Sequence, residues 1–228
     1  MPDTVILDVD GTLVDTVYEH TAAWAQAFAD VGLVVPGYVL HGAIGMSADL
    51  LVAHVAGDAV ERAVGDEVRA HHSAEFTRVA GRLRLLPGAD RVVGELQRRG
   101  HLVAVATSGS RHDTDRALEE VPDAALLDAV LTGDDLERGK PAPDLLDAAL
   151  EQVGGRSAVV VGDAPWDAFA ATKSGHVVIG VLTGGFTAAD LRAAGADLVF
   201  DSLEDMLDRV EETPLASADL GGRRRPAL

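Results

Sequence analysis

Four short runs of apolar residues, rich in valine and other β-branched side chains, constrain the fold of this chain most strongly. They span residues 4–9, 101–106, 157–161 and 177–182. Apolar residues follow one another in these runs without alternation, which is typical of parallel strands buried on both faces. Helical patterns at residues 90–99 and 141–153 precede the second and third runs. Strand and helix therefore alternate, which predicts an α/β fold with a doubly wound, Rossmann-like parallel sheet.

One long interval, residues 16–85, breaks this alternation because it shows helical periodicity and no convincing strand. Trp24, Phe28 and Val31 follow one another at spacings of four and three residues. Residues at these spacings share one face of a helix, so they predict an amphipathic helix over residues 20–31.

Two further helices are expected in the same interval, one capped by Ser47 and a polar one over residues 66–83. A run of helices after the first strand predicts a small α-helical cap domain inserted into the core. The core would then comprise residues 1–15 and 86–215. Residues 216–228, which include three consecutive arginines, are expected to form a flexible tail that does not bind nucleic acid.

Charge and composition exclude several classes of protein. Asp and Glu number 37 against 19 Lys and Arg, which gives a formal net charge of −18. Such a field repels nucleic-acid backbones and anionic membranes, so we expect neither as a partner. The absence of cysteine excludes disulfides, thiolate metal sites and cysteine nucleophiles. The amino terminus lacks the basic region of a signal peptide, and no apolar run approaches the roughly 20 residues of a membrane span, so we expect a cytoplasmic protein.

The first apolar run leads into an acidic segment that contains Asp8, Asp10 and Gly11. Ligands of open α/β sheets bind at the carboxyl ends of the strands. Two carboxylates that leave a buried strand there are costly unless a charge compensates them, and a divalent cation such as magnesium does so. Gly11 permits a tight turn and a close approach of the backbone to an anion. A common Asp-Gly turn is the structural alternative for this segment alone.

Three further polar segments follow later strands or open later helices. Residues 107–110 follow the second run, where small hydroxyls and amides can cradle an anion. Lys140 precedes a helix that starts with prolines, and it could neutralise both a carboxylate and a phosphate. Asp163 and Asp167 follow the third run and supply two more acids. Each segment alone has an ordinary structural explanation, but together they predict one site.

The ordered set Asp-x-Asp-Gly-Thr, Thr-Ser, Lys-Pro and Gly-Asp-x-x-x-Asp resembles the haloacid dehalogenase-like (HAD) hydrolase superfamily. The resemblance covers roughly residues 4–200, and the helical insert lies where that family carries its small α-helical cap. It implies a magnesium-dependent phosphomonoesterase that acts on a small phosphorylated metabolite through an aspartyl-phosphate intermediate.

The resemblance also implies a role for each matching residue. Asp8 would be the nucleophile, and Asp10 would be the general acid and base. Magnesium would be held by the Asp8 carboxylate, the main-chain carbonyl of Asp10 and Asp163, with Asp167 behind them or acting through water. The phosphate would be bound by Gly11, Thr107, Ser108, Gly109 and Lys140, of which Thr107 and Lys140 also count among the catalytic groups.

Asp10 distinguishes this chain from two branches of the superfamily, because members that remove halide or cut carbon–phosphorus bonds lack that acid. A sugar phosphomutase similar to β-phosphoglucomutase remains an alternative, since His20 and Trp24 at the start of the cap resemble those enzymes. Gly162, where those mutases carry glutamate, and residues 44–48, which lack their arginine, favour a phosphatase resembling phosphoglycolate phosphatases. A non-catalytic, phosphate-dependent switch is a third interpretation.

Few side chains of the cap can be assigned to the substrate from the sequence. His20 is the histidine considered for direct contact with it. His41, His71 and His72 have no spacing that pairs with acids, so we expect them at the surface.

Basic residues at the end of the cap are better candidates for contact with an anionic substrate, and they are Arg78, Arg82 and Arg84. The segment 184–187 is expected to turn into a helix that begins at Thr187, away from the site. The substrate itself and the oligomeric state are not fixed by these patterns.

Overall fold

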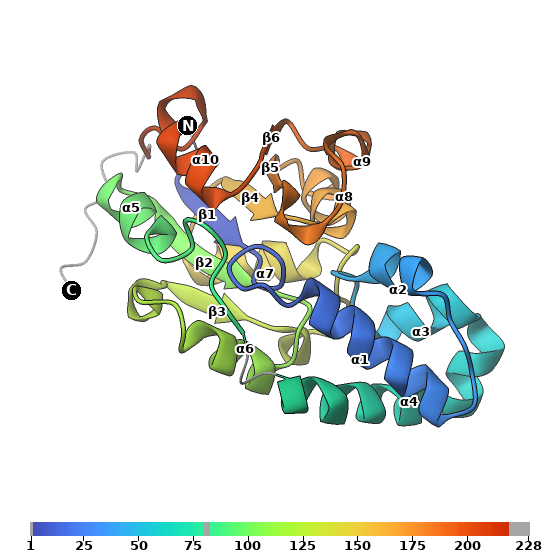
Figure 1. The fold of residues 1–228 in the computed structure, drawn as a ribbon. Coiled ribbons are helices and arrows are strands. Elements are labelled where there is room, and N and C mark those ends of the chain that lie inside the picture. The colour runs from blue at the N-terminus through green and yellow to red at the C-terminus, as the bar shows by residue number, and fades with distance from the viewer. Residues whose placement is uncertain (1, 80–82, 219–228) are drawn as a thin grey trace.

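A computed structural model describes residues 2–79 and 83–218 of the chain, and Figure 1 shows their fold. Six parallel strands form one sheet in the order β3-β2-β1-β4-β5-β6. This arrangement confirms the predicted doubly wound α/β fold. The strands are β1 (Thr4–Leu7), β2 (Leu102–Ala106), β3 (Ala129–Leu131), β4 (Ala158–Gly162), β5 (Val177–Val181) and β6 (Leu198–Phe200).

The two strands at the edges of the sheet, β3 and β6, were not predicted from the sequence. Each has three residues, which is too short a run to show a strand pattern. The four predicted runs are the inner strands β1, β2, β4 and β5, which are the longer ones.

Helices cover both faces of the sheet. On one face, α5 and α10 pack with α6 against the side chains of Val5 and Leu7. On the other face, α7, α8 and α9 pack against Ile6 and Val160. Because neighbouring residues of β1 point into different clusters, the strand is buried on both sides, as its unbroken apolar sequence predicts. These helices are α5 (Val92–Arg98), α6 (Arg111–Leu118), α7 (Asp144–Gln152), α8 (Pro165–Lys173), α9 (Ala188–Ala194) and α10 (Leu203–Asp208).

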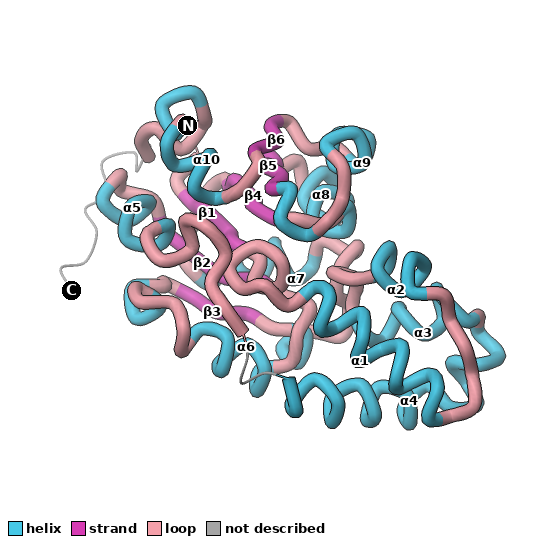
Figure 2. Tube along the Cα trace, in the orientation of Figure 1, coloured by secondary structure: helices cyan, strands magenta, loops and turns pink. Residues whose placement is uncertain are grey.

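Four helices follow β1 and gather beside the sheet, where the described residues include no strand (Figure 2). They share a hydrophobic cluster of their own, centred on Trp24, Phe28 and Leu51. The predicted helices at 20–31, after Ser47 and at 66–83 correspond to α1, α3 and α4, whereas α2 was not predicted. Their bounds are α1 (Val17–Asp30), α2 (Gly37–Ala43), α3 (Ala48–Ala56) and α4 (Asp58–Val79).

The two connections between these helices and the sheet run side by side. Val14 forms a β-bridge with Leu85, and the Asp15 N–H donates to the Arg84 carbonyl at 2.9 Å. The chain therefore leaves the sheet and returns to it at neighbouring positions. Arg82 and nearly all of the predicted tail, residues 219–228, lie outside the described residues.

No helix within residues 2–79 and 83–218 has the length and apolar character that crossing a bilayer requires.

Candidate active site

Asp8 and Asp163 lie at the carboxyl ends of two neighbouring strands, β1 and β4. The chain proceeds in opposite directions across the sheet from this pair of strands, which is where ligands of doubly wound sheets bind. Asp167 lies in the first turn of α8, directly after β4. One carboxylate oxygen from each of the three buried residues lies within 4.8 Å of the other two. The fold thus brings together three of the acids singled out in the sequence.

The ammonium group of Lys140 is buried between two of these acids. Its Nζ donates to Asp8 Oδ1 at 2.6 Å and lies 2.6 Å from Asp167 Oδ1. It also donates to the Ala106 carbonyl at 2.9 Å. Two of the three ammonium protons are therefore used in hydrogen bonds, and the contact with Asp167 is an ion pair. The structure therefore places the ammonium of Lys140 beside Asp8, inside the core.

The cluster contains three buried carboxylates and one ammonium, which pairs with Asp8 and Asp167, so it carries an excess of negative charge when the acids are ionised. Burial, together with the charges of Asp167 and Asp8, raises the pKa of Asp163 well above its usual value. Burial also raises the pKa of Asp8, against the lowering effect of Lys140. A divalent cation among hard oxygen ligands relieves such repulsion. The three carboxylates fit a cation of this kind.

Two glycines make room for the carboxylate of Asp163. Gly11 has a φ of +77°, and a Cβ built there would lie 2.4 Å from Asp163 Oδ2. A Cβ at Gly184 would lie 1.8 Å from the same oxygen. Thr12 Oγ1 donates to the other oxygen, Asp163 Oδ1, at 3.0 Å. The orientation of Asp163 therefore depends on the absence of side chains at both glycines.

One prediction changes at these glycines, whereas the phosphate contact expected at Gly11 stays a prediction. The Gly11 N–H donates to the Val14 carbonyl at 2.8 Å, which closes the tight turn expected there. Thr187 caps α9 as expected. However, the prediction that the segment 184–187 lies away from the site is wrong for Gly184, because a short-range pattern cannot show which loop approaches Asp163.

Asp10 belongs to a second network beside Asp8. Its Oδ1 accepts a hydrogen bond from Thr16 Oγ1 at 2.7 Å and lies 3.2 Å from His20 Nε2. Its Oδ2 lies 3.4 Å from Thr107 Oγ1. Burial raises the pKa of Asp10, but the neighbouring His20, through charge and hydrogen bonding, and the hydrogen bond from Thr16 outweigh burial and lower it. Asp10 is thus an acid that the surroundings hold ionised.

The residues predicted to cradle a phosphate follow β2 and face the two acids of β1. The Gly109 N–H donates to Thr107 Oγ1 at 3.1 Å. Ser108 Oγ donates to the Gly45 carbonyl, which belongs to the connection between α2 and α3, at 3.1 Å. All three predicted residues line the same pocket as Asp8.

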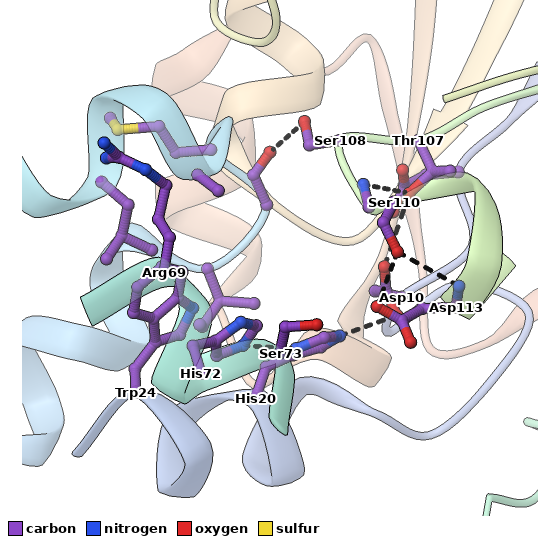
Figure 3. A pocket seen from close by; sticks show the side chains of 17 residues that line it. Asp10, His20, Trp24, Arg69, His72, Ser73, Thr107, Ser108, Ser110 and Asp113 are labelled. Atoms are coloured by element: carbon purple, nitrogen blue, oxygen red, sulfur yellow. Dashed lines mark hydrogen bonds and ion pairs between the residues drawn. The ribbon is translucent and has the colours of Figure 1, made fainter. Parts of the chain in front are cut away.

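This pocket lies between the sheet and the helices α1, α3 and α4 (Figure 3). Its volume of about 210 Å³ is below the roughly 300–1,000 Å³ of drug-sized ligand sites, which suits a small ligand. The sheet side contributes Asp8, Asp10, Thr107, Ser108, Gly109, Ser110 and Asp113, and the helical side contributes His20, Trp24, Ile44, Gly45, Met46, Ala48, Leu51, Arg69, His72 and Ser73.

His72 lines the pocket, so its predicted surface position is wrong. Its Nε2 lies 3.1 Å from His20 Nδ1, and its ring stacks on Trp24 with centroids 4.0 Å apart. His20 itself stacks on Phe76 at 3.8 Å. Burial, with a contribution from His20, lowers the pKa of His72 well below its usual value. The spacing of His72 to acids along the chain gave no signal, because its partner lies on another helix.

His41 also lies against other side chains instead of standing free at the surface. Its Nε2 lies 2.9 Å from the Gly184 carbonyl, and its ring stacks between Tyr18 and Phe186, with centroids 5.4 and 4.9 Å away. His71, by contrast, lies near acids of α1 and α4 and does not line the pocket.

The arginine that lines the pocket is Arg69, which the sequence did not single out. Arg78 pairs with Glu75 one turn earlier on α4 and does not line the pocket, and neither does Arg84. Arg69 lies on the same face of α4 as His72, three residues away. That spacing is a helical signal which could have identified it.

The comparison with protein families agrees with this geometry. A family model described as haloacid dehalogenase-like hydrolase matches residues 2–175. The chain belongs to this family. Two curated relatives of the HAD hydrolase are each 31% identical to it. One is validoxylamine A 7'-phosphate phosphatase of Streptomyces hygroscopicus subsp. limoneus, where the match covers 80% of this chain and 87% of the relative. The other is phosphoglycolate phosphatase of Rhodospirillum rubrum, where the match covers 95% and 98%.

Solved structures agree with the fold of this HAD hydrolase. A hydrolase from Pseudomonas syringae superposes with a TM-score of 0.87 at 30% identity, over 92% of this chain and 98% of its own. A provisionally assigned beta-phosphoglucomutase from Bacteroides vulgatus superposes with a TM-score of 0.80 at 25% identity, over 92% and 87%. The fold therefore does not by itself separate hydrolase from mutase.

In this HAD hydrolase the end of α2 and the connection from α2 to α3 lie directly against the sheet domain. The Ser47 N–H donates to the Lys140 carbonyl at 3.0 Å, and Trp166 Nε1 donates to the Gly42 carbonyl at 3.1 Å. With the hydrogen bond from Ser108 to Gly45, these contacts hold the helical side of the pocket closed over the acids.

Proposed function

We propose that this HAD hydrolase is a magnesium-dependent phosphomonoesterase that acts on a small phosphorylated metabolite through an aspartyl-phosphate on Asp8. One observation carries the proposal. The carboxylate of Asp8 is buried with Lys140, Asp163 and Asp167, and it lies at the floor of a small pocket that Asp10 also lines. The curated relatives named as phosphatases support the same reaction.

The covalent step follows from the positions of Asp8 and Asp10. An Asp8 oxygen forms a bond to phosphorus while the bond from phosphorus to the ester oxygen breaks. Asp10 gives a proton to the departing alcohol, for which it must first be protonated. In the second step Asp10 removes a proton from a water molecule that attacks phosphorus. The bond to Asp8 then breaks, and inorganic phosphate leaves.

Neutralisation of charge is the main task of the surrounding residues. Asp8, Asp163 and the main-chain carbonyl of Asp10 would hold Mg²⁺, with Asp167 supporting them from behind. Bound there, the ion would offset the charge that accumulates on the phosphoryl oxygens. Lys140 holds Asp8 in place and neutralises it. Residues 107–109, which line the pocket, are proposed to bind the phosphate.

The helices α1–α4 are proposed to act as the cap, residues 16–85, over a core of residues 1–15 and 86–215. Closure of such a lid excludes bulk water from the reaction. The paired connections at Val14 and Leu85 support a hinge at this position. A cytoplasmic location and the absence of a nucleic-acid partner stay predictions.

Phosphate release from p-nitrophenyl phosphate tests this function. Wild-type protein should release phosphate with Mg²⁺ and lose that activity in EDTA. The Asp8→Asn variant should lose activity by roughly four orders of magnitude while its melting temperature is retained. The exposed Asp201→Asn variant serves as the control. Equal rates in EDTA, or normal turnover by Asp8→Asn, would contradict the proposal.

A sugar phosphomutase is the second candidate, favoured by the likeness to the Bacteroides vulgatus protein. Such an enzyme must hold both phosphates of a bisphosphate intermediate. Incubation with a sugar 1-phosphate distinguishes the two functions by their products. A mutase returns an isomerised sugar phosphate, whereas a phosphatase releases inorganic phosphate.

A further inference from the structure

The pocket differs in charge between its two sides. On the sheet side, Asp8 and Asp10 face the position of the phosphate, and Asp113 adds a third acid from α6. The only hydrogen bond to the Asp113 carboxylate among the described residues comes from Ser110 Oγ, at 2.7 Å, and no described basic residue forms an ion pair with it. The charge of Asp113 is therefore not compensated locally.

On the helical side, Arg69 is the only lysine or arginine among the described residues that line the pocket. Its guanidinium is already occupied. Nη1 and Nη2 donate to the two carboxylate oxygens of Glu61, each at 2.9 Å, and Nη2 also donates to Asp66 at 2.7 Å. A bidentate pair of this kind is among the stronger ion pairs of proteins. Two acids thus balance this arginine, and His20 on the same side lies 3.2 Å from the Asp10 carboxylate, so each basic group described here already faces an acid.

The other side chains on the helical side are largely apolar. Trp24, Ile44, Met46 and Leu51 are all buried. His72 offers no positive charge near neutral pH, because burial lowers its pKa. A second anionic group of a substrate would lose its hydration here without gaining a counter-ion, which is costly.

We infer that the pocket selects phosphate monoesters whose leaving group carries no negative charge, and that it disfavours bisphosphates and phosphorylated carboxylic acids. This inference rests on the proposed function and specifies its substrate class. The net charge of −18 acts in the same direction, because it repels an additional anion during approach. An alcohol or polyol leaving group fits the apolar and neutral lining.

Matched pairs of substrates test the inference on the wild-type protein. The first pair is 2-hydroxyethyl phosphate and 2-phosphoglycolate, and the second is glucitol 6-phosphate and 6-phosphogluconate. Within each pair a terminal CH₂OH replaces a carboxylate. The assays contain Mg²⁺ at fixed ionic strength. In the pair that is turned over better, we expect kcat/KM for the neutral member to be at least about tenfold higher than for the carboxylate member. Equal values, or a preference for the carboxylate, would overturn the inference.

Variants of α4 test the part played by Glu61. In Glu61→Gln the Arg69 guanidinium loses its bidentate partner and is freed for an anion. The ratio of neutral to carboxylate kcat/KM should then fall about fivefold or more. The exposed Glu67→Gln makes the same change of charge on the same helix without a contact to Arg69, so it should leave the ratio unchanged. A ratio that stays constant in Glu61→Gln, with folding verified by its melting curve, would contradict the role assigned to Glu61.

Turnover of p-nitrophenyl phosphate in parallel distinguishes failure of the inference from failure of the proposed function. If p-nitrophenyl phosphate is hydrolysed while the carboxylate members are preferred, only the inference is overturned. If no phosphate ester is hydrolysed, the proposed function fails, and the inference fails with it.

Discussion

Lys140 Nζ lies 2.6 Å from Oδ1 of Asp8, although 132 positions separate the two residues along the chain. The lysine precedes α7, and the aspartate follows β1. Both side chains are buried, with 1% and 6% of their surface exposed. A charge pair so deeply buried persists only when each partner compensates the other. The stability of the core and the proposed activity therefore both depend on this pair.

Replacement of Lys140 by methionine removes the ammonium and leaves Asp8 and Asp167 without it. We expect loss of stability by about 3–5 kcal/mol when measured by urea unfolding in EDTA, because unpaired charges stay buried. Phosphatase activity should fall by at least about a hundredfold. Lys173→Met is the matched control, since Lys173 is exposed and, within the described part of the chain, donates only to the Pro141 carbonyl. Similar stability of the two variants would contradict this interpretation.

Gly184→Ala tests whether Asp163 needs the space that this glycine leaves. The new Cβ would lie 1.8 Å from Asp163 Oδ2, so the carboxylate must move. We expect the Mg²⁺ concentration for half-maximal activity to rise about tenfold, and stability to fall by about 1–3 kcal/mol. Gly37→Ala is the control, because nothing lies within 4 Å of its Cβ position. An unchanged Mg²⁺ requirement in Gly184→Ala would contradict the proposal that Asp163 helps to bind the metal.

His72 predicts a pH dependence of stability. Burial lowers its pKa in the folded protein, whereas the unfolded chain protonates near the usual value of 6.5. Below about pH 6.5 the unfolded state thus binds more protons than the folded state, so protonation favours unfolding as the pH falls. His72→Gln removes this contribution. Its stability relative to wild type should rise by up to about 1.4 kcal/mol per pH unit between about pH 6.5 and pH 5.

Urea unfolding at a series of pH values gives this difference directly. The exposed His112→Gln variant corrects for the general effect of losing a histidine. A difference between His72→Gln and wild type that does not vary with pH would show that His72 titrates alike in both states.

The inner strands and the acidic motifs could be predicted because their signals are local. Unbroken apolar runs indicate strands buried on both faces, and Asp8 and Asp163 follow such runs directly. Parallel strands have their carboxyl ends at the same edge of the sheet. Acids that directly follow neighbouring strands are therefore expected to lie close together. The structure accordingly brings Asp8, Asp163 and Asp167 together.

Contacts between distant elements account for what the sequence did not show. His72 and Arg69 line the pocket only because α4 packs beside α1, and Gly184 is required only because its loop approaches Asp163. The ammonium of Lys140 is held inside the core by two hydrogen bonds and an ion pair, which the motif alone does not reveal. Pairings of this kind depend on packing, and periodicity shows at most that Arg69 and His72 share one face of a helix.

The central claim is that the carboxylate of Asp8 becomes phosphorylated during turnover. The Asp10→Asn variant with p-nitrophenyl phosphate tests it most directly, because p-nitrophenolate leaves without protonation whereas attack by water needs the base. After acid quenching, peptide mass spectrometry should find the mass of one phosphoryl group on the peptide that contains Asp8. The adduct should be absent when Asp8→Asn is combined with Asp10→Asn. Phosphate release without any adduct, or an adduct on another residue, would contradict the account.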